Sequence, residues 1–135
     1  MNVGVKADGL DHKVAETDCW GTIKVQPVNS NIVEIIAKQA GKTRFTEIDA
    51  ISAGGPSLTQ LVKDTTEADT VTIETLSHRL TKGPADAHVV SGSWRDYKTD
   101  RSSNGSIIKY RCIAEGFSGE TPLGEKFPAK FDDKF

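Results

Sequence analysis

The sequence has few of the residues from which metal and redox sites are built. Its 135 residues include only two cysteines, Cys19 and Cys112, and three histidines, none of them with CxxC, HxH or HxxxH spacing. Structural zinc sites need four converging ligands, usually in closely spaced pairs. We therefore expect no metal centre and no cofactor. The two cysteines are interpreted as free thiols, with a disulfide between them as the alternative.

Long runs of one charge and long apolar runs are also absent. The formal net charge is −2, and acidic and basic residues are interleaved along the chain. Without a basic stripe or a polybasic segment, we expect no nucleic-acid partner and no membrane surface. The apolar runs are too short to span a bilayer. Residues 1–8 lack the apolar stretch of a signal peptide, so a cytoplasmic location is the default expectation.

Catalytic motifs are missing as well. No GxSxG nucleophile elbow occurs, and Gly54-Gly55 by itself is not a phosphate-binding loop. The carboxylates are scattered, and no pair among them indicates a glycosidase. The set considered is Asp8, Asp11, Glu16, Asp18, Glu34, Glu47, Asp49, Glu67, Asp69 and Glu74. We expect these carboxylates to be solvated on outward faces of strands.

What the chain does contain is a series of short β-rich segments separated by turn residues. The predicted strands are residues 3–7, 22–26, 32–38, 43–51, 58–63, 70–80, 89–97, 107–114 and 125–131. Gly, Pro, Asn and Ser gather between them, with the clearest turn at 53–56. Nine strands at nearly regular spacing favour an antiparallel sandwich or barrel.

Two of these segments also have helical features. Asn31 followed by Glu34 is a capping pattern, and Ile32, Ile35 and Ile36 have helical spacing. Leu58–Lys63 is a weaker case of the same kind. We favour strands for both, because Ile32–Lys38 is dense in β-branched residues, which lose side-chain freedom in a helix.

The segment Ser103-Asn104-Gly105-Ser106 predicts a hairpin. Asn-Gly adopts the positive φ angles of a type I′ turn, which would join residues 89–97 to 107–114. In the second of these strands the alternation of apolar and charged residues predicts one buried face.

The run Ser91-Gly92-Ser93-Trp94 carries the most information in the chain. It resembles the Ser-Gly-x-Trp strand that opens small bacterial lipocalin-like proteins of unknown function. Their next signatures are an Asn-Gly turn, a Thr-Pro-x-Gly-Glu turn and a strand that ends Lys-x-Asp-Gly. The corresponding residues here are Asn104-Gly105, residues 121–125 and residues 130–133, with Asp133 in place of the final glycine.

The second half of that family resembles the first part of this chain. The matching features are the hairpin from Asn29 to Glu34, the Gly41-Lys42 turn and the Ser-Ala-x-Gly turn at residues 52–55. The chain thus resembles a single β-barrel domain, 1–135, in permuted order, with 1–85 as the second half of one unit and 86–135 as the first half of the next. A short similarity between residues 5–9 and 129–133 agrees with a unit cut inside a strand.

The resemblance implies an antiparallel barrel of about 8–10 strands and a structural role for Gly92, Trp94 and Arg79. In such barrels the tryptophan closes one end and packs on an arginine from a late strand, and Arg79 lies in the strand before Trp94. A guanidinium on an indole face contributes roughly 0.5–2 kcal/mol.

The leading functional hypothesis is non-enzymatic binding of a small, largely apolar molecule in the barrel. The candidate cavity residues are Ile35, Phe45, Ile73, Trp94, Tyr110 and Phe127. A second hypothesis is an assembly module that forms a homodimer through its terminal strands, residues 3–7 and 129–131. A third is a small-molecule enzyme that uses Tyr97, His78 or His88 as acid–base groups at the barrel mouth.

Overall fold

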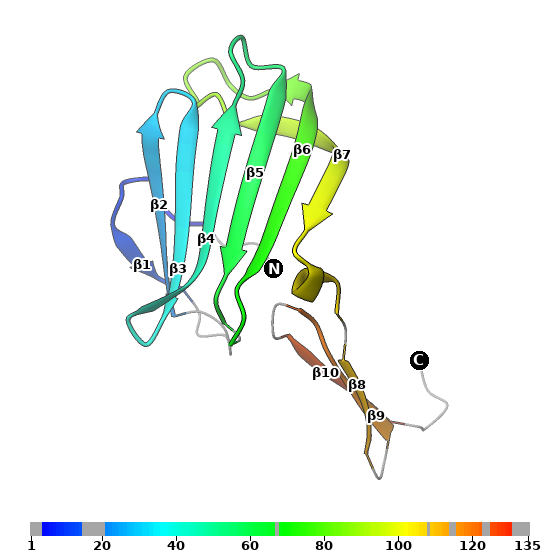
Figure 1. Ribbon diagram of the computed structural model, residues 1–135. Helices are drawn as coiled ribbons and strands as arrows, with labels where there is room; N and C mark the ends of the chain where they lie inside the picture. Colours follow the sequence, from blue (N-terminus) through cyan, green and yellow to red (C-terminus); the bar gives the residue numbers. More distant parts are fainter. Residues whose placement is uncertain are drawn as a thin grey trace.

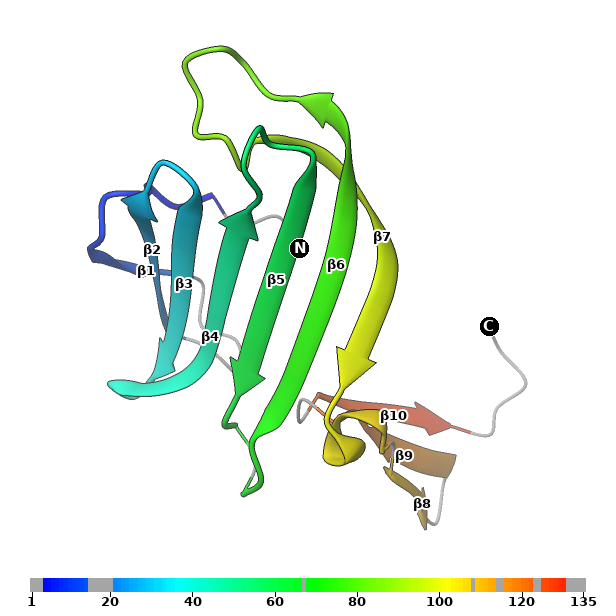
Figure 2. The same cartoon turned by 45° about the horizontal axis from the view of Figure 1, so that its top comes forward.

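A computed structural model of the chain describes residues 4–14, 21–66, 68–107, 109–113, 116–122 and 125–130. These residues form an all-β structure of two antiparallel sheets. Figures 1 and 2 show a bent seven-stranded sheet, with a three-stranded sheet lying beyond its β7 end. The all-β, antiparallel prediction is confirmed.

The seven-stranded sheet follows the order of the chain, so that each strand pairs with the next. Its strands are β1 (Asp11–Lys13), β2 (Thr22–Asn29), β3 (Ile32–Gln39), β4 (Lys42–Ile51), β5 (Ser57–Asp64), β6 (Val71–Lys82) and β7 (Gly92–Arg101). The two segments with helical features are strands, as predicted. In the part of the chain that the structure describes, β1 and β7 do not pair, and no closed barrel is present.

The two faces of this sheet differ in burial. The register places the apolar residues Ile23, Val25, Val33, Ile35, Ala37, Phe45, Ile51, Leu58, Val62, Val71 and Ile73 on one face, together with Glu47, Asp49, Gln60, Asp64 and Ser77. The buried side chains of the sheet all belong to this set. The opposite face carries the alternate residues, which include lysines and threonines. The cavity candidates Ile35, Phe45 and Ile73 of the sequence analysis lie on this buried face.

The loop of residues 83–91 shows which way the sheet bends. It leaves β6, and His88 Nε2 lies 2.8 Å from the carbonyl oxygen of Asn29, at the end of β2. The backbone N–H of Val90 donates to His88 Nδ1, so Nε2 carries the proton and donates to Asn29. The loop leaves β6 and returns to β7, so it can contact the end of β2 on the way only if the sheet curls toward it. We call the buried face, defined by the residues above, the concave face.

Two strand boundaries differ from the predictions at the N-terminal side. The first strand is Asp11–Lys13, whereas residues 4–7 form no strand and Val3 lies outside the described residues. Pairing with β2 and the 2.7 Å ion pair between Asp11 and Lys38 hold this polar segment in place. The strand β2 continues through Pro27, predicted as a turn. Proline is tolerated there because β1 pairs only with residues 22–24 and the register shifts after Pro27.

The predicted hairpin at the Asn-Gly pair is wrong. Residues Ser103–Ser106 form a 3₁₀ turn, and β7 does not pair with β8 (Lys109–Ile113). The Ser102 N–H donates to the Thr72 carbonyl, and the Thr72 N–H donates to the Ser102 hydroxyl oxygen. The Asn104 side chain donates to the Thr70 carbonyl. These contacts with the start of β6 direct the chain away from β7.

The three-stranded sheet consists of β8, β9 (Gly116–Glu120) and β10 (Lys126–Lys130), in the order β10-β9-β8. Its register aligns Tyr110, Gly119 and Phe127. The Phe127 ring lies so close to Gly119 that a Cβ at that position would collide with it. The chain thus folds into two sheets of different size.

Candidate functional site

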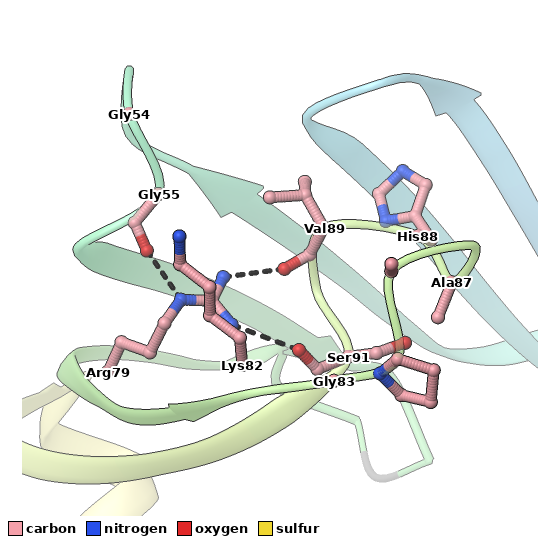
Figure 3. A pocket seen from close by; sticks show the side chains of 11 residues that line it. Gly54, Gly55, Arg79, Lys82, Gly83, Ala87, His88, Val89 and Ser91 are labelled. Carbon is pink, nitrogen blue, oxygen red and sulfur yellow. Dashed lines mark hydrogen bonds between the residues drawn. The ribbon is translucent and has the colours of Figure 1, made fainter.

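One end of the concave face is closed by a network around Arg79, shown in Figure 3. The Arg79 guanidinium donates through Nε to the Gly55 carbonyl at 2.6 Å, through Nη2 to Val89 at 2.5 Å and through Nη1 to Ser91 at 2.9 Å. A planar group with five donors suits this task, because one side chain can hold several carbonyls in a fixed arrangement. Arg79 therefore ties the turn after β4 to the loop after β6.

Trp94 completes this end of the sheet. The Arg79 guanidinium carbon lies 3.9 Å from the centroid of the Trp94 ring, and Trp94 Nε1 donates to the Val90 carbonyl at 2.9 Å. The contact arises because Arg79 and Trp94 are paired residues of β6 and β7. Stacking a cation on an indole is favourable, and the indole N–H finds a partner.

Gly92 is required by the same arrangement. Its φ angle is 134°, and a Cβ there would collide with the Thr81 carbonyl oxygen and lie 3.0 Å from Arg79 Nη1. Only glycine adopts this backbone conformation without a steric penalty. Gly92, Arg79 and Trp94 thus act together as a structural unit that closes one end of the concave face.

A cavity of about 290 Å³ lies beside this unit. It is lined by Gly54, Gly55, Arg79, Lys82, Gly83, Pro84, Ala85, Ala87, His88, Val89 and Ser91. Arg79 and His88 donate hydrogen bonds to backbone carbonyls, so their role here is to shape the cavity. The cavity differs from the predicted one, whose candidate residues lie elsewhere.

A group of polar side chains occupies the middle of the concave face. Glu47 and Asp49 lie two residues apart on β4, and Gln60 of β5 is paired with Asp49. Gln60 Nε2 donates to Glu47 Oε1 at 3.1 Å. Asp49 is 7% exposed, and its Oδ1 atom is buried without a hydrogen-bond partner.

The burial of these two carboxylates changes their protonation. Burial, followed by the negative charge of Asp49, raises the pKa of Glu47 to about 7. Burial also raises the pKa of Asp49. Desolvation penalises the charged form of each group, and two close carboxylates resist double ionisation. The expectation that the carboxylates are solvated on outward faces is therefore wrong for this pair, whose inward placement depends on strand register.

The six predicted cavity residues are brought together only in part. Ile35, Phe45 and Ile73 share the concave face and are half-buried. Trp94 lies at the closed end of that face. Phe127 belongs to the three-stranded sheet and is 39% exposed, and Tyr110 is placed in the same sheet by register, with its side chain outside the described residues.

Of the three acid–base candidates of the enzyme hypothesis, His78 and Tyr97 lie together and His88 lies apart from them. The His78 and Tyr97 rings are stacked, with centroids 4.1 Å apart and an interplanar angle of 11°. His78 follows the buried Ser77 along β6, so it lies on the face opposite the concave one and is exposed. His88 lies in the end loop. The residues that the structure describes contain no metal-binding cluster.

Two other predictions concern residues outside this site. Cys19 lies outside the described residues, as does the side chain of Cys112, so the prediction of free thiols remains a prediction. Among the helices of the described part of the chain, none is long and apolar enough to cross a membrane.

Comparison of the chain with protein-family models, with curated proteins and with solved structures finds no match.

Proposed function

We propose that the protein binds a small, largely apolar molecule on its concave face without catalysing a reaction, within a permuted lipocalin-like barrel. The observation that carries the proposal is the apolar concave face itself. Ile23, Val33 and Leu58 are less than 10% exposed, although the seven strands form one layer. A curved sheet with an apolar concave face is the geometry on which barrel proteins bind small apolar ligands.

The closed end supports the same proposal. The network around Arg79 holds the loop of residues 83–91 across one end of the curved sheet. A bound apolar molecule would gain from every contact that removes it from water, by about 25 cal/mol per Å² of buried apolar area. Because this end is already closed and ordered, less conformational entropy is lost when a ligand binds.

The test uses a fluorescent hydrophobic probe and a matched pair of variants on β3. Ile35→Phe enlarges a side chain on the concave face, and Ile36→Phe makes the same change on the opposite face. We expect the folded protein to bind the probe, and Ile35→Phe to weaken binding about tenfold through lost space. Circular dichroism under the same conditions verifies that both variants are folded.

Ile36→Phe should leave the affinity for the probe unchanged. Absence of probe binding by the folded, unmodified protein would refute the proposal. Equal effects of the two variants would place the binding surface away from the concave face.

A second candidate function, assembly, is favoured by the three-stranded sheet. Its strands have five residues each and pair only among themselves in the described part of the chain. A sheet this small is stable when a face packs against another element. The unpaired edges of β7 and β10 offer backbone groups to a second copy, as in strand exchange.

Light scattering tests the assembly hypothesis. The full chain, a variant lacking residues 1–7 and the variant Phe127→Lys should be compared at tens of micromolar. A homodimer that uses the three-stranded sheet becomes monomeric only with Phe127→Lys, whereas one that uses the N-terminal residues becomes monomeric on their deletion. A monomeric full chain contradicts both forms.

A further inference from the structure

The pair Glu47–Asp49 is out of place on the apolar concave face, and its environment indicates what it could bind. Both residues lie in the central strand β4, and their neighbours on the same face include Val33, Ile35 and Val62. Burying carboxylates among such residues is costly unless they are paired with donors. Natural structures keep unsatisfied buried polar groups for a reason, often a functional one.

The hydrogen bonds within the pair leave one strong acceptor unused. Gln60 donates to Glu47, and the Asp49 side chain is hydrogen-bonded to Gln60 and Glu47, which leaves the Asp49 Oδ1 atom buried without a partner in a residue that is 7% exposed. The ion pairs among the described residues are His12–Asp8, Lys38–Asp11 and Lys98–Asp100, and none involves Glu47 or Asp49. The site therefore has negative charge and acceptor capacity without a cation.

The other charged groups that register places on this face do not neutralise the pair. Asp64 Oδ1 accepts from the Thr66 N–H, and Asp96 Oδ1 accepts from the Ser77 hydroxyl at 2.6 Å. His12 lies opposite Ile23 on β1, and Arg101 lies opposite Ile73 on the edge strand β7, where it is exposed. Arg79 also lies on this face, but its guanidinium donates to Gly55, Val89 and Ser91 at the closed end. Two further carboxylates thus add to the negative character of the concave face away from that end.

We propose that Glu47 and Asp49 form the anchor for the ammonium group of an amine ligand whose apolar part covers the concave face. This inference rests on the proposed function and adds the chemical class of the ligand. An ammonium group has three N–H donors and one positive charge, which match the free Asp49 Oδ1 and the Glu47 carboxylate. The aliphatic rows on both sides of the pair then contact the hydrocarbon part.

Binding an ammonium group in this position has a consequence for protons. A nearby cation favours the ionised form of Glu47, so the ligand displaces the proton that Glu47 holds at pH values below about 7. The affinity for an amine should therefore increase as the pH rises through this value. The amine stays protonated throughout, because the pKa of an alkylammonium group resembles the lysine value of about 10.4.

The experiment compares n-octylamine with 1-octanol, which have the same chain length and differ in charge. Titration calorimetry at about pH 8 should show octylamine binding about tenfold more tightly than octanol, with a smaller difference at about pH 6. Asp49→Asn and Glu47→Gln should each abolish most of this preference while retaining the binding of octanol. Both substitutions preserve side-chain shape and remove a buried charge, so the variants should fold.

The control is Glu74→Gln, which removes a carboxylate from the opposite face of the same sheet. It should keep the full preference for octylamine. Loss of the preference in this control would show non-specific attraction by net charge and would overturn the anchor.

The remaining outcomes separate the two proposals. Equal affinities for octylamine and octanol would overturn the anchor and leave the proposed binding function standing. Failure of both compounds to bind would overturn both.

Discussion

The two sheets of this protein differ in what holds their strands together. In the seven-stranded sheet, side chains from β2 to β6 meet on a concave face, and one end is locked by Arg79 and Trp94. In the three-stranded sheet, the contacts include the strand pairings, the hydrogen bonds between Thr121 and Glu125 and the Phe127 ring over Gly119. Hydrogen-bonded pairing is present in both sheets, and the buried apolar side chains that the structure describes belong to the large sheet.

The largest expected effect comes from breaking the closed end of the large sheet. Trp94→Ala should lower the free energy of unfolding by about 3–5 kcal/mol, because it removes a large aromatic side chain, its stacking on Arg79 and its hydrogen bond. Tyr97→Ala is the control on the same strand. Tyr97 is 54% exposed, and its substitution should cost about 1 kcal/mol or less. Urea unfolding gives both values, and similar losses would show that Trp94 is peripheral.

Hydrogen exchange can measure the contrast between the sheets directly. Backbone amides of β3 to β5 should exchange only on global unfolding, since both of their edges are paired. Amides of β8 to β10 should exchange through local opening, at a free energy lower by about 2 kcal/mol or more. Equal protection in both sheets at low protein concentration would mean that the small sheet shares the core.

The buried carboxylates give a pH dependence to the large sheet. The pKa of Glu47 is about 7 in the folded protein, above its ordinary value of 4.5. The folded state therefore holds this proton more strongly than the unfolded state. The stabilisation is complete below about pH 4.5 and is lost as the pH rises to about 7.

Glu47→Gln should flatten this part of the stability profile. We expect the variant to exceed the unmodified protein by about 1 kcal/mol at pH 8, after allowance for solvent screening, and to match it near pH 5. Denaturant unfolding at the two pH values measures the difference. A profile unchanged by the substitution would contradict the raised pKa of Glu47.

The smallest expected effect concerns the turn between β3 and β4. Ala40 and Gly41 both have positive φ angles, 49° and 77°, as a two-residue hairpin turn requires. A residue with a Cβ is strained in this conformation, so Ala40→Gly should raise stability by about 0.5–1 kcal/mol. Thermal unfolding of the variant measures this gain. A loss of stability would show that the left-handed conformation at Ala40 is not retained in solution.

Local patterns in the sequence determine a large part of this fold. The alternation of apolar and polar residues predicts strands β2 to β6 and identifies their buried face. Such patterns succeed because side chains of a strand alternate between two faces, whatever the partner strand. The contact between Arg79 and Trp94 was an expectation, and it arises because the two residues are paired on adjacent strands.

The tertiary structure alone decided where the chain departs from its local preferences. The Asn-Gly pair at 104–105 favours a hairpin turn, but hydrogen bonds between Ser102 and Thr72 and from Asn104 to Thr70 override that preference. The burial of Glu47 and Asp49 also depends on tertiary structure. Alternation with Phe45 assigns these residues to a face, but their desolvation requires the neighbouring strands and the curvature of the whole sheet. A sequence specifies local conformational preferences, whereas the desolvation of a charge depends on every segment packed around it.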